Sequence, residues 1–192
     1  MKNLRDFFYP IWDVFLEHVD EWNQRRRGIL FFALSVGLLT LILYFFDDYL
    51  VSIWTTDDRS GFWNELARGF SYWGDFLTFC IPVGLGLMII GFFKNKRLVH
   101  RAGAACLLGA CLAGLTADIL QISISRPRPR HDVQSYAGFF KTESEFHSFP
   151  SGHSATAFGS TTALAVVYPP AAPVLLAGAG GVAWSRLYLG AH

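Results

Sequence analysis

The sequence SFPSGHSA at residues 148–155 joins a polar loop to an apolar segment that continues to Tyr168. Two comparable polar stretches, SRPRPR at residues 125–130 and SRLYLGAH at residues 185–192, also lie at the ends of apolar segments. An apolar segment of about 20 residues is long enough to cross a bilayer as a helix. The alternation predicts an all-α membrane protein in which arginine- and histidine-bearing helix ends meet at one membrane surface.

The composition favours a membrane protein over a soluble one. Of the 192 residues, 52% are hydrophobic and only 16% are charged, whereas soluble domains carry about 25% charged residues. The net charge of +1 gives no reason to expect a nucleic-acid partner. Cys80, Cys106 and Cys111 lie in apolar segments, where we expect small packing residues rather than disulfides or metal ligands.

Five apolar segments are expected to cross the membrane after an amphipathic N-terminal helix in residues 1–27. This first helix lies either in the membrane interface or against the cytoplasmic side of its own domain, and the sequence leaves both open. A short helix at residues 62–73 is expected at the interface. Residues 28–192 are expected to form one transmembrane domain. Its five spans are residues 28–46, about 74–93, about 102–124, 153–168 and 173–188.

The distribution of charge predicts the orientation in the membrane. Basic residues gather at 25–27 and 94–101, which the positive-inside rule places in the cytoplasm, and acidic residues gather at 47–58, which are then outside. Counting spans onward leaves the N-terminus in the cytoplasm and all three polar stretches on the outer, periplasmic face of the plasma or inner membrane. The basic residues 126–130 argue against this placement by charge alone, but arginines that bind phosphate have a separate reason to be there.

Small residues are concentrated in the third to fifth expected spans, among them Gly103, Gly109, Gly114 and Gly159. Small faces let membrane helices approach one another closely. These three spans are therefore expected to form the core of the bundle.

The first two polar stretches carry groups that bind phosphate. The arginines of residues 126–130 are interleaved with prolines, which hold the chain extended. A guanidinium pairs two phosphate oxygens at once and stays charged. Ser151 and Gly152 precede an expected helix, and the free N–H groups and dipole at a helix N-terminus favour an anion.

The second and third stretches add two histidines. One of His153 and His192 can serve as nucleophile and the other as proton donor near neutral pH. Each stretch alone has an ordinary explanation, because an Arg-Pro repeat can anchor lipid headgroups and Pro-Ser-Gly-His can cap a helix. Their joint occurrence on one face favours a phosphate site.

The sequence resembles the type 2 phosphatidic acid phosphatase (PAP2) superfamily of integral membrane lipid phosphatases. The family signature is Lys-x6-Arg-Pro, then Pro-Ser-Gly-His, then Ser-Arg-x5-His. Residues 150–153 and 185–192 match the second and third parts completely, whereas the first part matches at Arg128-Pro129 but has Gln121 in place of lysine. The resemblance covers about residues 74–192. The vanadate haloperoxidases share the signature but are soluble, and the apolar spans argue against them.

The resemblance implies a two-step reaction at the outer membrane surface, without a metal or another cofactor. His192 would attack phosphorus to give a phosphohistidine, and His153 would protonate the leaving alkoxide. The resemblance also implies a sixth span after the third motif, so the domain is expected to be cut at that motif. The residues implied to hold the phosphate are Gln121, Arg128, Ser151, Gly152 and Arg186.

Gln121 departs from the family pattern because an amide donates hydrogen bonds but brings no charge. Either Arg126 or Arg130 compensates, or the enzyme is slow, or the phosphate of its substrate differs. Asp118 lies one helical turn before Gln121 on the same face. An acid inside a span is a functional candidate by default, although a hydrogen-bonded residue in a helix interface is the alternative. Arg126 and Asp118 are therefore supporting candidates.

The central loop contains His131 and His147 with Glu143 and Glu145. These residue types can bind a metal, but a solvated loop near the substrate entrance is the preferred interpretation. No metal site is predicted.

The expected function is hydrolysis of a lipid phosphate monoester or pyrophosphate, with membrane lipids as surroundings and no protein partner predicted. Phosphatidate, phosphatidylglycerophosphate, undecaprenyl pyrophosphate and lipid A phosphates are all candidate substrates. Two alternatives stay open: a lipid phosphotransferase that uses the same site, and a non-catalytic protein that binds lipid phosphates.

Overall fold

The computed structural model describes residues 61–128 and 139–190 and seven further helical positions between Phe8 and Leu38. The chain divides into two compact units, Met1–Trp54 and Thr55–His192. The expected amphipathic helix and first span belong to the first unit and fall almost wholly outside the described residues. The helical bundle is the second unit.

Every regular element in residues 61–128 and 139–190 is helical. The chain begins with amphipathic helix α3, continues through a π-helical segment η1 into α4, and then forms three further long helices and two short 3-10 turns. In chain order these are α3 (Phe62–Trp73), η1 (Phe76–Cys80), α4 (Ile81–Phe93), α5 (Arg97–Ile124), η2 (Ser144–Phe146), α6 (Gly152–Val167), η3 (Pro169–Ala171) and α7 (Ala172–Tyr188). The predicted all-helical class is confirmed for this part of the chain.

Two of these segments are long and apolar enough to cross a membrane. They are Phe76–Phe93, which joins η1 to α4, and Arg97–Ile124, which is α5. Helix α5 is about 42 Å long at 1.5 Å per residue, which exceeds the roughly 30 Å apolar core of a bilayer. Helices α6 and α7 have 16 and 17 residues, and their crossing of the membrane stays a prediction.

The third span is predicted from about residue 102, and the helix that contains it, α5, begins earlier, at Arg97. Arg97, His100 and Arg101 are therefore part of the helix and not of the preceding loop. His100 is buried against Phe92, with ring centroids 5.9 Å apart. Gly91 allows this approach, since a Cβ atom there would collide with the backbone of His100.

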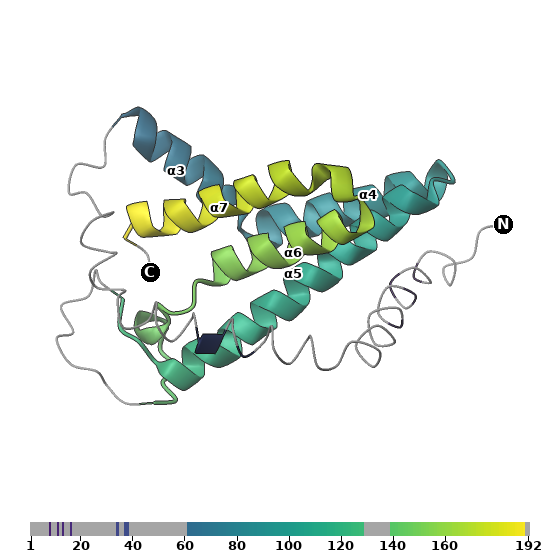
Figure 1. Ribbon diagram of the computed structural model, residues 1–192. Coiled ribbons are helices and arrows are strands. Elements are labelled where there is room, and N and C mark those ends of the chain that lie inside the picture. Colours follow the sequence, from purple (N-terminus) through teal and green to yellow (C-terminus); the bar gives the residue numbers. More distant parts are fainter. Residues whose placement is uncertain are drawn as a thin grey trace. The chain divides into compact units, whose positions relative to one another are not determined.

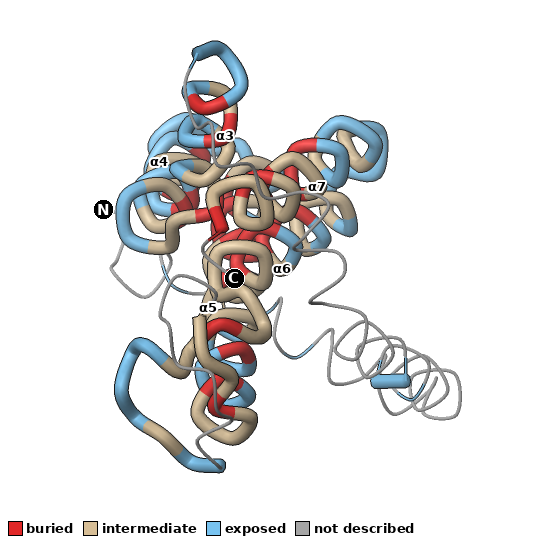
Figure 2. Tube along the Cα trace, turned by 90° about the vertical axis from the view of Figure 1, so that its left-hand side faces the viewer, coloured by how far each residue is buried: buried red, intermediate tan, exposed pale blue. Residues whose placement is uncertain are grey.

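Small residues bring the long helices into backbone contact, as the sequence predicted. A Cβ atom at Gly109 of α5 would collide with the carbonyl oxygen of Gly159 of α6, and the reverse also holds. On the other side of α5, a Cβ atom at Gly103 would meet the backbone of Gly84 and Met88 of α4. The buried positions therefore face the interior of the bundle, and the exposed ones lie on its outside (Figure 2).

Helix α3 packs on α7 in a different way, through large rings over glycines. The ring of Trp73 covers Gly178, and the ring of Phe70 covers Gly181. Phe70 and Trp73 are stacked with centroids 6.5 Å apart, and Trp184 meets Phe70 edge-on at 6.4 Å. This layer fixes the end of α3 against the middle of α7.

The connectivity brings four helix ends to the same end of the bundle. Because successive long helices run in opposite directions, the start of η1, the end of α5, the start of α6 and the end of α7 lie together (Figure 1). All of the described candidate site residues are at or near these ends.

Candidate active site

The start of α6 is the centre of the candidate site. Ser151 is the residue before the helix, has an extended backbone, and accepts a hydrogen bond on its Oγ from the N–H of Ser154 at 3.4 Å. This bond satisfies one of the free N–H groups of the first turn. The remaining N–H groups and the helix dipole make this end attractive to an anion.

The loop after α5 carries the arginines, and Ser125 fixes its beginning. Ser125 ends α5 in the left-handed conformation and is fully buried. Its Oγ donates to the carbonyl of Ile122 and accepts from the N–H of Lys141, both at 2.7 Å. The arginine loop is thus tied to the second half of the central loop.

Further bonds hold the arginine loop against the residues that precede α6. The N–H of Ser148 donates to the carbonyl of Arg126 at 3.2 Å, and the Arg126 guanidinium donates to Ser148 Oγ at 3.3 Å. The N–H of Arg128 donates to the carbonyl of Glu145 at 2.8 Å. Arg128 Nε is buried and has no hydrogen-bond partner within the described part of the chain. Arg126 therefore supports the loop, and Arg128 keeps a donor for a ligand.

Arg186 reaches the site from the last turn of α7. Its Nη1 donates to the hydroxyl of Ser71 on α3 at 2.7 Å. A positive charge at a helix C-terminus is favoured by the helix dipole. Helix α3 thereby helps to position one of the predicted phosphate-binding arginines.

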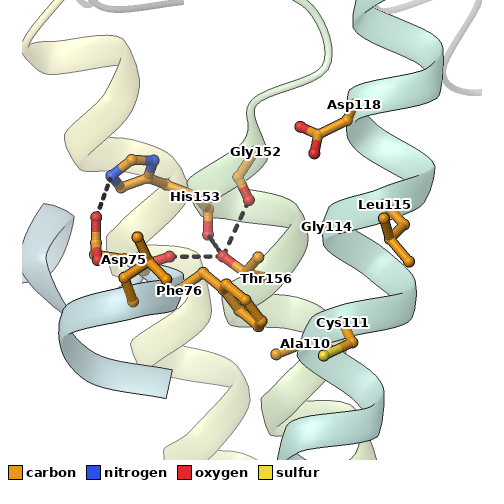
Figure 3. A pocket seen from close by; sticks show the side chains of 12 residues that line it. Asp75, Phe76, Ala110, Cys111, Gly114, Leu115, Asp118, Gly152, His153 and Thr156 are labelled. Atoms are coloured by element: carbon orange, nitrogen blue, oxygen red, sulfur yellow. Dashed lines mark hydrogen bonds and ion pairs between the residues drawn. The ribbon is translucent and has the colours of Figure 1, made fainter. Parts of the chain in front are cut away.

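The imidazole of His153 faces a carboxylate from another element. Its Nε2 is 3.7 Å from Oδ2 of Asp75, the residue before η1 (Figure 3). The other oxygen of Asp75, Oδ1, accepts hydrogen bonds from the amide and the hydroxyl of Thr78, each at 2.7 Å. Asp75 is therefore held on one side and free to interact with His153 on the other.

Asp75 and His153 lie at helix ends, at the boundaries of the expected spans and outside the two candidate membrane spans Phe76–Phe93 and Arg97–Ile124. The hydrogen bond from the Thr78 amide lowers the pKa of Asp75, and the Thr78 hydroxyl and His153 add to this effect against the opposing cost of burial. Burial lowers the pKa of His153, and the charges of Arg186 and Arg128 lower it further, whereas Asp75 acts in the opposite direction. Asp75 is thus the group that favours a protonated His153.

Gln121 lies beside the start of α6, and its side chain takes part in the hydrogen bonding of the fold. It is buried, with 7% of its surface exposed, and its Nε2 donates to the carbonyl of Pro150 at 2.6 Å. The same nitrogen is 3.7 Å from the point where a Cβ atom of Gly152 would lie. The position where the family has lysine is close to the second motif, and here it anchors the backbone of that motif.

A cavity of about 410 Å³ opens beside these groups, between η1, α5 and α6. Its polar side is formed by Asp75, Asp118, Gly152, His153 and Thr156. Its apolar side is formed by Phe76, Leu77, Ala110, Cys111 and Leu115. Asp118 points across this cavity toward the start of α6 (Figure 3). The cavity thus joins a polar end that faces the histidine to an apolar wall along the helices.

A family model and two curated relatives point to the same family. The PAP2 superfamily model matches residues 102–192. A lipid A 1-phosphatase of Rhizobium etli is 34% identical over 88% of this chain and 75% of that protein. The chain belongs to the PAP2 superfamily. A second lipid A 1-phosphatase, from Rhizobium johnstonii, is 29% identical over 88% of the PAP2 chain and 72% of that relative.

A second family model, described as the N-terminal 7TM region of histidine kinase, matches residues 7–142. This match ends before the second and third PAP2 motifs, so it includes neither predicted catalytic histidine. It agrees with the PAP2 relatives on a membrane protein. No solved structure matches the chain.

Two residues considered for the PAP2 site, His192 and Arg130, lie outside the described part of the structure. His131 of the central loop, for which no role is predicted, lies outside it too. His147 is described, and its Nε2 is 3.1 Å from the carbonyl of Lys141, so it takes part in the bonding of the central loop. Within residues 61–128 and 139–190, no three His, Cys, Asp or Glu side chains gather as metal ligands would.

Sequence reasoning placed Asp75 at the end of a span but missed its contact with His153. It also missed Ser71, which binds Arg186, and Thr156, whose Oγ1 donates to the carbonyl of Gly74 at 2.6 Å. One signal for these contacts was present in the sequence, the position of Asp75 at the boundary of an apolar segment. An acid is costly at such a position without a partner.

Proposed function

We propose that this PAP2 chain is a membrane phosphatase that hydrolyses a lipid phosphate monoester or pyrophosphate through a phosphohistidine at His192. The observation that carries the proposal is the convergence on His153 of the α6 N-terminus, two arginines from separate elements and a fixed carboxylate. This set supplies the positive charge, the directed N–H groups and the proton donor that phosphoryl transfer requires.

The first step transfers the phosphoryl group to the enzyme. A ring nitrogen of His192 forms a bond to phosphorus while the bond from phosphorus to the lipid oxygen breaks. Protonated His153 gives its proton to that oxygen, so the lipid leaves as a neutral alcohol. For a pyrophosphate substrate the leaving group is instead the lipid monophosphate. The Asp75 charge supports this step because it favours the protonated imidazole.

The second step releases phosphate. His153, now neutral, accepts a proton from a water molecule, whose oxygen attacks phosphorus as the bond to His192 breaks. The products are inorganic phosphate and the original enzyme, with His153 protonated again. The same residue therefore acts as acid and then as base, as reversal of the chemistry requires.

The phosphate is proposed to lie between Arg128, Arg186, Ser151 and the N–H of Gly152. The Nε of Arg128, which has no partner among the described residues, and the helix start at Ser151 support this placement. Gln121 takes a lesser part, because its amide donates to Pro150. Gln121 carries no charge where the family has lysine. In this mechanism the positive charge of the site comes from the arginines.

A lipid A phosphate is the substrate we propose first. Both of these relatives carry the name lipid A 1-phosphatase. The apolar wall of the cavity is suited to a chain of the lipid, and its polar end is suited to the headgroup. The active site is proposed to face the periplasm, with the N-terminus in the cytoplasm, as the charge distribution of the sequence indicates.

Phosphate release in detergent, with a chelator present, tests this function. Lipid A, phosphatidate, phosphatidylglycerophosphate and undecaprenyl pyrophosphate form the panel, and the His192→Ala protein is the blank. We expect release from at least one lipid, abolished in the blank and largely retained in His131→Ala, because His131 has no role in the proposed reaction.

Three results would contradict the proposal. Equal losses in the two histidine variants would remove the assigned role of His192. Loss of activity with the chelator, restored by a divalent metal, would contradict a metal-independent reaction. Formation of a new phosphorylated lipid in place of inorganic phosphate would identify a phosphotransferase.

A further inference from the structure

We propose that Asp75 is a positioning residue that orients the His153 ring and favours its protonated form, which gives its proton to the leaving group. This inference rests on the proposed function, because it assigns a partner to the acid of that reaction. No part of the PAP2 signature contains Asp75, which precedes His153 by 78 positions in the chain.

The two oxygens of Asp75 have different tasks. Both hydrogen bonds from Thr78 go to Oδ1, which fixes the plane of the carboxylate. Oδ2 then faces His153 Nε2 at 3.7 Å. This separation is longer than a hydrogen bond, as is common for catalytic pairs before substrate binds. With one ring nitrogen directed at Asp75, the second points away from it and is available for proton transfer (Figure 3).

The backbone that carries Asp75 is fastened to α6 independently of its side chain. Thr156 lies one turn after His153 and donates from Oγ1 to the carbonyl of Gly74 at 2.6 Å. A Cβ atom at Gly74 would be 2.8 Å from the carbonyl oxygen of His153, so only glycine allows this approach. The segment before η1 is thus held at a fixed distance from the catalytic turn.

The charges around His153 explain why a carboxylate is needed. Arg186 approaches from α7 and Arg128 from the loop after α5, and both disfavour a second positive charge. Asp118 of α5 borders the same cavity as His153. The Asp75 carboxylate is within ion-pair distance of His153, and it opposes the effect of the two arginines on the protonation of that ring. Without Asp75, His153 would be harder to protonate.

Asp75→Asn separates this role from a structural one. Asparagine still accepts the Thr78 bonds that cap η1, but it has no charge. Glu65→Gln is the matched control, since Glu65 is an exposed acid of α3 remote from these contacts. Thr78→Val keeps the charge of Asp75 and removes one of the two bonds that fix it.

The kinetic test measures kcat and KM against pH with two substrates, the preferred lipid and an aryl phosphate. A general acid contributes about 10²–10⁴-fold in rate, and we expect Asp75→Asn to lose about 10- to 100-fold in kcat on the lipid with KM within about threefold. The basic limb of its pH profile should move to lower pH. Aryl phosphate should show a much smaller loss, because a phenolate leaves without a proton. Thr78→Val should lose less of its kcat on the lipid than Asp75→Asn, and Glu65→Gln should have the kcat of the parent protein.

Equal losses on both substrates with an unchanged pH profile would overturn the proposal and leave Asp75 as a helix cap. A direct titration of His153 by nuclear magnetic resonance gives a readout that needs no turnover. The pKa of His153 should be lower in Asp75→Asn than in the parent, and an unchanged value would also overturn the proposal. A parent protein inactive on every lipid would instead contradict the proposed function, while this titration would still decide the role of Asp75.

Discussion

The start of α6 is supported from two sides, and the two supports differ in what they touch. On the η1 side, Asp75 faces the ring of His153. On the α5 side, Gln121 donates to the main-chain carbonyl of Pro150. The first support acts on a side chain that is proposed to carry a proton, and the second acts on the backbone alone. Loss of the first should therefore change the pH dependence of the reaction, whereas loss of the second should lower the rate at every pH.

The α5 support depends on close packing between α5 and α6, and breaking that packing should have the largest effect. Gly159→Ala places a Cβ atom against the carbonyl of Gly109. Overpacking of this kind costs about 1–3 kcal/mol, and we expect a clear fall in Tm in detergent together with lost activity. Gly86→Ala is the matched control, since no atom lies within 4 Å of the added methyl group. Gly86→Ala should keep or slightly raise Tm, and equal falls in the two variants would contradict the packing described.

Removal of the Gln121 side chain should have a smaller effect of a distinct kind. Gln121→Ala leaves the Pro150 carbonyl without its donor, and an unsatisfied buried group costs about 1–3 kcal/mol. We expect a lower Tm and a lower kcat, with equal loss on alkyl and aryl phosphates and no shift in the pH profile. A shift of the pH profile like that expected for Asp75→Asn would contradict the proposed difference between Asp75 and Gln121.

Gln121→Lys tests the same position by adding a group instead of removing one, and it should raise the rate. The lysine restores a charge next to Gly152, close to the proposed phosphate, and its ammonium can still donate to Pro150. Charge-assisted bonds are about twice as strong as neutral ones. We expect kcat/KM to rise by about tenfold, and an unchanged or lower value would show that the charge is not missing from this site.

Sequence reasoning predicted the helices well where hydrophobicity decides them. Residues 62–73 form α3 as expected, and α6 and α7 lie within one residue of the ranges predicted for them. Helix α5 extends beyond the predicted span at its start, because basic side chains at Arg97 and Arg101 can reach a polar surface while their backbone remains helical. The tight contact of Gly109 with Gly159 follows from the small residues of these helices.

The candidate site was predictable as far as local motifs reach. His153, Ser151, Arg128 and Arg186 belong to motifs that each end or begin a helix, and the alternating direction of the helices brings them together. The role of Asp75 was not predictable, because its partner lies 78 residues away and no spacing rule relates the two. Nor could the sequence show that the Gln121 amide is engaged by Pro150, since this depends on how a loop folds against α5.

Capture of the phosphoenzyme tests the central claim most directly. The protein would be mixed with a lipid that carries a radiolabelled phosphate and quenched in alkali, which preserves phosphohistidine, before peptide mapping. We predict label on the peptide that contains His192, lost on treatment with acid and absent from His192→Ala. Active hydrolysis with no label, or with label on a serine that survives acid, would contradict the proposed mechanism.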